Sequence, residues 1–78
     1  MAKPPLPPEL KRKFGQAVQW MRHDLDVSQE ELAARAEIHR TCLGDVERGN
    51  RNVALVNICR IAAALGVKPS VLFQRMGL

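Results

Sequence analysis

Hydrophobic residues recur at helical spacing along most of the chain. The first repeat spans residues 9–23, where one face of a helix carries Leu10, Phe14, Ala17, Val18 and Met21. Similar spacing predicts helices at 29–36, 39–48, 55–65 and 69–75. No stretch alternates hydrophobic and polar residues for long enough to indicate a strand. The pattern therefore predicts an all-α fold of short helices packed around one core.

The later helices each have an apolar face and recognisable ends. The residues expected to face the core are Leu32, Ala33 and Ala36, then Leu43 and Val46, then Leu55, Ile58, Ile61, Ala62 and Leu65, and finally Val71, Leu72 and Phe73. Ser28 followed by Glu31 is the residue pair of a capping box, so a helix is expected to begin directly after Ser28. Gly49 and Gly66 are expected to end helices in the left-handed conformation.

Length and proline content divide the chain into a tail and a domain. The chain has 78 residues, which is enough for one domain at 9–78. Residues 1–8 hold four of the five prolines and are expected to form a flexible, extended N-terminal tail. Such a tail is either disordered without function or a proline-rich ligand for another protein.

The distribution of charge favours a polyanionic partner. The net charge is +3 over residues 1–13, −3 over residues 14–50 and +4 over residues 51–78. Basic ends around an acidic middle suit a nucleic acid, although the same charges would also serve solubility alone.

Other kinds of site are not indicated. No apolar run approaches the ~18–20 residues of a membrane span, and the start of the chain lacks the apolar region of a signal peptide. Two cysteines make no disulfide framework, so a cytoplasmic location is expected. His39 and Cys42 lack further ligands at metal-site spacing, and one small core leaves little room for a catalytic cleft. We therefore expect no metal, cofactor, small-molecule ligand, membrane association or enzymatic activity.

The stretch from Ser28 to Gly49 carries the functional information. It contains two short helices joined by a tight turn, and a helix of about eight residues is too short to be stable alone. The first helix therefore makes sense as a brace that holds the second at a fixed angle. A helix held in this way can enter the major groove of DNA, where its exposed side chains reach the base edges.

Three motifs in order carry a family resemblance: Ser28-Gln29-Glu30-Glu31-Leu32-Ala33, Val46-Glu47-Arg48-Gly49 and Ile61-Ala62-Ala63-Ala64-Leu65-Gly66-Val67. With these motifs, residues 10–74 resemble the Cro/C1-type helix-turn-helix family of phage repressors and bacterial regulators. His39-Arg40-Thr41 together with residues 45–53 is similar to the controller proteins of restriction–modification systems. The resemblance implies a compact five-helix domain that binds double-stranded DNA sequence-specifically and regulates transcription.

The resemblance also implies residue roles. The residues expected to read bases are Arg40, Thr41 and Asp45. The residues expected to contact the DNA backbone are Ser28, Gln29, His39, Arg48, Asn50, Arg51 and Asn52. The chemistry agrees, because an arginine can bind guanine O6 and N7 with two donors and a threonine methyl can pack on a thymine methyl. Asp45 is either a reader of cytosine or an inert acid on the helix surface.

Two structural features of the family bear on this chain. Arg22 and Glu47 occupy the positions of an ion pair that fixes the angle of the base-reading helix; the alternative is a solvated Arg22. Asp26 and Glu37 stand where the family usually has glycine. A left-handed residue other than glycine costs about 1 kcal/mol, so the geometry of these two turns is expected to be strained.

The C-terminal segment has more apolar residues than one short helix buries. By resemblance to controller proteins, the residues expected to form a homodimer interface are Val71, Leu72, Phe73 and Met76. A two-fold dimer would read a palindromic operator, and a monomer is the alternative. Trp20 and Leu25 lie off the main face of the first helix and either pack locally or form a second contact. The alternative function is an antitoxin-like protein-interaction module that also binds DNA.

Overall fold

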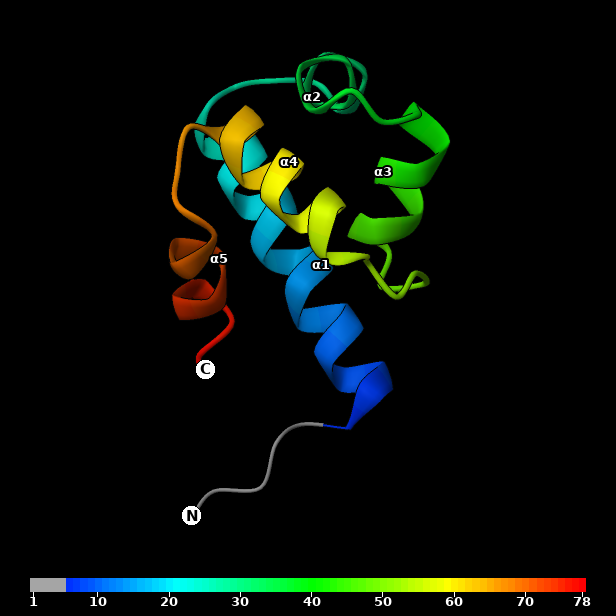
Figure 1. Cartoon of the computed structure of the whole chain (residues 1–78), viewed down its shortest axis with the longest axis vertical. Helices are drawn as coiled ribbons and strands as arrows, with labels where there is room; N and C mark the ends of the chain where they lie inside the picture. The colour runs from blue at the N-terminus through cyan, green and yellow to red at the C-terminus, as the bar shows by residue number, and fades with distance from the viewer. Residues whose placement is uncertain (1–5) are drawn as a thin grey trace.

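The computed structural model describes residues 6–78, and within this range every regular element is a helix (Figure 1). The helices are α1 (Pro7–Asp24), α2 (Gln29–Ala36), α3 (Arg40–Glu47), α4 (Leu55–Leu65) and α5 (Pro69–Arg75). The all-α prediction is confirmed, as are the bounds of α2, α4 and α5. Helix α3 is one residue shorter at each end than predicted.

The first helix begins two residues earlier than predicted. Pro7 and Pro8 form its first turn rather than the end of a tail. Proline is tolerated there because the backbone N–H groups of a first turn have no partner within the helix. Residues 1–5 of the expected tail lie outside the residues that the structure describes.

Helix α1 runs through the centre of the molecule. Helix α3 packs against it on one side, α4 and α5 pack against it elsewhere, and α2 contacts both α3 and α4. The N-terminal turns of α1 project beyond the other helices (Figure 1). Among residues 6–78, no single helix is long and apolar enough to span a membrane. Helices α4 and α5 have the required length and hydropathy only when counted together, and a 91° bend separates them.

All four of the later helices contribute to one core with α1. The fully buried large side chains are Val18, Leu32, Leu43, Val46, Ile61 and Leu72. Leu55 was expected to face this core but is 74% exposed. It is the first residue of α4. Leu10 is also partly exposed, near the projecting end of α1.

The structure corrects half of the predicted dimer interface. Leu72 and Met76 are 0% and 6% exposed, so they belong to the core of the protomer itself. The reason is that α5 packs against both α1 and α4 and fills the space between them. Val71 is half-buried, and Phe73 is exposed at the edge of this packing.

Two turns contain the left-handed residues that the family resemblance implied. Asp26 and Glu37 have φ values of 56° and 57°, where the family usually has glycine. Gly49 and Gly66 also have positive φ; Gly49 follows Arg48, the C-cap of α3, and Gly66 is itself the C-cap of α4. Ser28 Oγ accepts a hydrogen bond of 3.1 Å from the Glu31 amide, as expected for the cap of α2.

Helices α1 and α3 approach each other closely at Gly15. A Cβ atom at this position would lie 2.1 Å from the Val46 carbonyl oxygen and 2.8 Å from that of Glu47. Any larger residue would therefore push the end of α3 away from α1. Glycine at this position sets the distance between the two helices.

Candidate nucleic-acid interface

A buried hydrogen-bond network fixes the angle at which α3 leaves the core. Arg22 on α1 donates to Glu47 on α3 through Nε (2.7 Å) and Nη2 (3.0 Å). The remaining terminal nitrogen of Arg22 donates to the Val27 carbonyl oxygen at 2.9 Å, and Gln29 Nε2 donates to Glu47 Oε1, also at 2.9 Å. The expected ion pair is present and ties α1, α2 and α3 together at one point.

The first turn of α3 presents polar side chains to solvent. Arg40 and Thr41 are exposed, and His39, which immediately precedes the helix, is exposed as well. Gln29, Arg40 and Thr41 border a shallow hollow on the outer face of α3. Gly44 and Arg48 complete the lining of this hollow. The braced helix thus offers hydrogen-bond donors on the face that points away from the core.

Asp45 lies between two arginines of this chain. Its Oδ1 accepts a hydrogen bond from Arg48 Nη2, and its Oδ2 lies 3.5 Å from Arg51 Nη2. Both carboxylate oxygens therefore face arginines of this chain. The sequence did not predict this arrangement, because the path of the loop that carries Arg51 depends on tertiary packing.

The loop after α3 lies against the basic N-terminal half of α1. A Cβ atom at Gly49 would lie 2.9 Å from the Cα atom of Arg12, so the loop touches α1 at this point. Asn50, Arg51 and Asn52 follow and are all exposed. The exposed side chain of Arg12 belongs beside this group, and sequence reasoning missed it. The available signal was the cluster of basic residues before residue 14.

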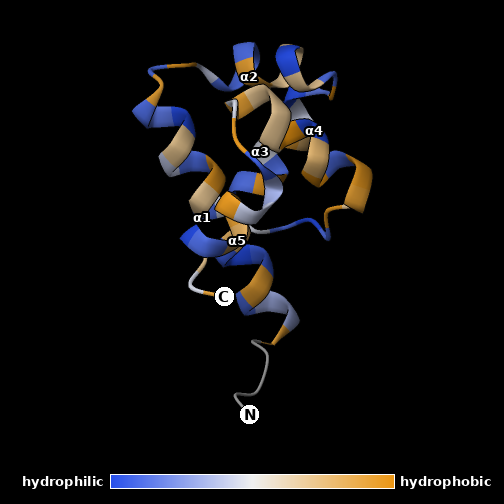
Figure 2. Ribbon diagram, turned by 60° about the vertical axis from the view of Figure 1, so that its left-hand side comes forward, coloured by the Kyte–Doolittle hydropathy of each residue, from blue (hydrophilic) through white to orange (hydrophobic). Residues whose placement is uncertain are grey.

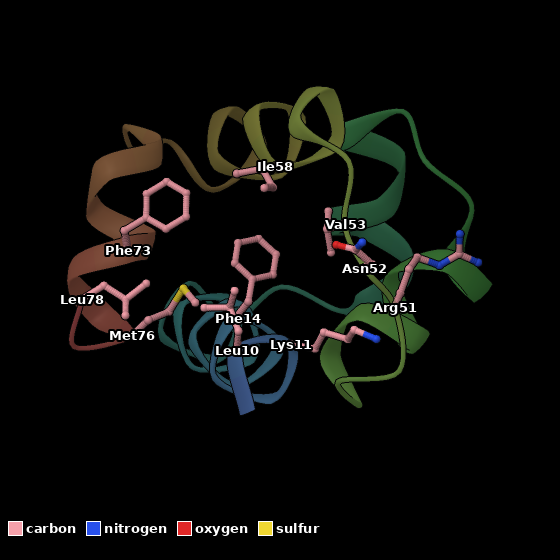
Figure 3. A pocket seen from close by; sticks show the side chains of 10 residues that line it. All are labelled: Leu10, Lys11, Phe14, Arg51, Asn52, Val53, Ile58, Phe73, Met76 and Leu78. Carbon is pink, nitrogen blue, oxygen red and sulfur yellow. The ribbon is translucent and has the colours of Figure 1, made fainter. Parts of the chain in front are cut away.

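An apolar groove opens on the side of the molecule formed by α1, α4 and α5 (Figure 3). Its volume is about 220 Å³, and Phe14, Ile58 and Phe73 point toward its centre. Lys11 and Arg51 lie at the end of the groove nearest the loop that follows α3. The groove is therefore apolar in its interior and basic at one end.

The first turn of α4 carries an apolar patch next to this groove, which we call the α4 patch. It consists of Leu55 and Val56, which are 74% and 60% exposed. The hydrophilic loop after α3 runs directly into this hydrophobic turn (Figure 2). Trp20 on α1 and Leu25 just after it are also about half exposed, so local packing covers only part of each side chain.

Comparison with known proteins agrees with this geometry. A family model described as helix-turn-helix (HTH_3) matches residues 18–72. The control protein C.BamHI from Bacillus amyloliquefaciens is 50% identical over 62 residues, which cover 78% of this chain and 76% of that protein. The control protein C.MunI from a Mycoplasma species is 41% identical over 67 residues, which cover 85% of this chain and 90% of that protein.

A solved structure gives the same result. The restriction–modification controller protein C.AhdI from Aeromonas hydrophila matches with a TM-score of 0.79 and 46% identity, over 81% of this chain and 96% of that one. The fold, the family match and these relatives lead to one conclusion: the chain belongs to the Cro/C1-type helix-turn-helix family of DNA-binding transcription regulators.

Proposed function

We propose that this protein recognises a specific DNA sequence by placing α3 in the major groove. The observation that carries the proposal is the exposed pair Arg40 and Thr41 on the first turn of a helix held by a buried ion pair. The N-terminal residues of a recognition helix are the ones that reach base edges. In this role Arg40 binds guanine through two donors, and the Thr41 methyl packs against a thymine methyl.

Polar groups around α3 supply the contacts to the DNA backbone in this proposal. They are Ser28, Gln29, His39, Asn50, Arg51 and Asn52, with Arg12 extending the surface along α1. Gln29 uses one amide hydrogen for Glu47, which leaves the second for a phosphate oxygen. These contacts fix the register of the protein on the duplex but carry no sequence information.

The proposal includes a homodimer. One module offers few base contacts, whereas a two-fold dimer reads two half-sites about one DNA turn (~34 Å) apart. The α4 patch is the most exposed apolar surface of the described helices. Ile58 lies one helical turn after Leu55 and lines the groove, so the α4 patch adjoins the groove along α4. Burial of this surface against a second copy removes it from water.

The relatives suggest which genes are regulated. C.AhdI is named as a restriction–modification controller, and C.BamHI and C.MunI are named as control proteins. We infer that this chain controls genes of a restriction–modification system and acts in the cytoplasm, where the DNA lies. A reporter fused to the region upstream of its own gene should change its output when the protein is expressed. An unchanged output, despite binding to that region, would contradict this role.

Two substitutions separate base reading from backbone binding. Arg40→Ala should weaken binding to the preferred site by about 1–3 kcal/mol and relax the preference at one base pair. Arg51→Ala should weaken binding to all duplexes alike, because a phosphate contact is blind to sequence. Fluorescence anisotropy on a panel of single-base-pair variants of the site measures both effects. Equal losses on every duplex for both variants would contradict the assignment.

A further inference from the structure

Gly44 occupies a position in α3 where glycine is unexpected. Glycine is the poorest helix former after proline, and α3 has only eight residues. The backbone at Gly44 does not require glycine, because its φ is not among the positive values that Gly49, Gly66 and Gly77 show. Its surroundings explain it instead. A Cβ atom at Gly44 would lie 3.2 Å from Arg48 Nη1 and 3.7 Å from Nη2.

The guanidinium of Arg48 therefore packs over the bare α-carbon of Gly44. Arg40, Gly44 and Arg48 are spaced by four residues each and lie on one face of the helix. By folding back over Gly44, Arg48 moves its charge about 6 Å toward the N-terminal end of α3, since four residues rise ~1.5 Å each. This places the guanidinium in the hollow that Arg40 and Thr41 also line.

Asp45 holds the guanidinium in this position. The Arg48 side chain is 60% exposed, yet one of its terminal nitrogens donates to Asp45 Oδ1. An arginine has five N–H donors, so the remaining ones still provide the two that guanine O6 and N7 accept. The second oxygen of Asp45 lies 3.5 Å from Arg51 Nη2, so arginines of this chain face both oxygens of the carboxylate.

We propose that Arg48 is a base-reading residue and that Asp45 is its positioning residue, rather than a reader itself. This inference rests on the proposed function, since it requires α3 to lie in the major groove. It assigns to Arg48 a specificity that a backbone contact would lack. It also gives the helix-weakening glycine a purpose, which is to leave room for the guanidinium on the reading face.

A double-mutant cycle between protein and DNA tests the proposal. Binding of the wild type, Arg48→Ala, Arg48→Lys and Asp45→Asn is measured on the selected site and on each of its single-base-pair variants. Arg51→Ala is the matched control, because it also removes an arginine that faces the Asp45 carboxylate. Circular dichroism melting confirms that each variant is folded.

We expect the Arg48 variants to lose their sequence preference at one base pair of the site. For the wild type, changing the base pair that Arg48 reads should weaken binding on the order of 5- to 150-fold. For Arg48→Ala and Arg48→Lys that change should have little further effect, while the penalties elsewhere persist. Asp45→Asn should reduce discrimination at the same base pair and raise affinity for unrelated DNA, because it removes a negative charge from the surface. Arg51→Ala should keep every penalty.

Other outcomes overturn the proposal. If Arg48→Ala weakens all duplexes equally, Arg48 contacts only the backbone. If Asp45→Asn removes discrimination at a different base pair, Asp45 is itself a reader. If the wild type binds all duplexes equally well, the proposed function itself is wrong. This result differs from the two above, in which the wild type still prefers its site.

Discussion

Arg22 and Glu47 bury two opposite charges where α1, α2 and α3 meet. Their side chains are 10% and 3% exposed, and the Glu47 carboxylate accepts three hydrogen bonds from Arg22 and Gln29. Such a pair adds little net stability compared with apolar residues of the same size. The pair instead fixes the orientation of α3 relative to α1, because Arg22 and Glu47 join the two helices through two hydrogen bonds.

Removal of one partner leaves the other charge buried and unpaired. Arg22→Ala should therefore lower the free energy of unfolding by about 3–5 kcal/mol. The control is Arg35→Ala, whose pair with Glu31 is about half exposed and should contribute less than ~1 kcal/mol. Urea denaturation followed by circular dichroism compares the two. If both variants lose the same small amount of unfolding free energy, the buried pair does not stabilise the fold more than an exposed one.

At this scale, local signals were predictable and distant contacts were not. The cap at Ser28 and the left-handed Gly49 follow from neighbours within a few residues, and both were predicted. The partners of Asp45 were not predicted, because they depend on the folding of Arg48 back along α3 and on the path of a loop. The position of Arg12 beside this loop was missed because its neighbour Gly49 is distant in sequence.

Helices α1 and α3 are held together by backbone contact as well as by the ion pair. The absent side chain at Gly15 lets α1 lie directly against the last carbonyl groups of α3. Rigid backbone on both sides leaves no flexible side chain to yield. The position of α3 therefore depends on this single glycine as directly as on Arg22.

Gly15→Ala tests this dependence. Alanine favours an isolated helix by up to about 1 kcal/mol, so propensity alone predicts stabilisation. We expect a net loss of about 1–3 kcal/mol instead, because the new Cβ overlaps the carbonyl oxygens of Val46 and Glu47. Thermal melting measures the effect, and Gln19→Ala on the exposed face of α1 is the control. Stabilisation by Gly15→Ala would contradict the close approach.

The periodicity of apolar residues predicted the bounds of the helices better than it predicted which of their residues are buried by neighbouring helices. The repeat in α4 gave its bounds and most of its buried face, but not that Leu55 stands clear of the core. The apolar residues of the C-terminal segment, together with the resemblance to controller proteins, implied an interface at Leu72 and Met76, which the protomer itself buries. A pattern of apolar residues marks a face to be covered, while the covering element depends on how distant helices pack.

Residues 6–78 combine a basic, polar surface around α3 with an apolar patch on α4. A two-fold dimer formed through the α4 patch would present two copies of α3 to one DNA duplex. Specific affinity then depends on dimer formation, because each copy contributes only half of the base contacts.

Leu55→Asp should separate dimer formation from folding. Leu55 is 74% exposed, so the charge should leave the core and the melting profile of the protomer largely intact. In the dimer it would place two like charges in an apolar interface, so sedimentation should show a monomer and affinity for the full operator should fall. Leu25→Asp, at a site 47% exposed after α1, is the matched control. A dimer that survives Leu55→Asp would place the interface elsewhere.

We propose that a braced α3 reads DNA sequence as part of a symmetric dimer. Selection of binding sites from a random duplex library, with the purified protein at near-physiological salt, tests both parts of this proposal at once. We expect enrichment of a two-fold symmetric motif whose half-sites lie about one DNA turn, or ~34 Å, apart. Enrichment of no motif by the folded protein would contradict sequence-specific recognition, and an asymmetric single site would contradict the dimer.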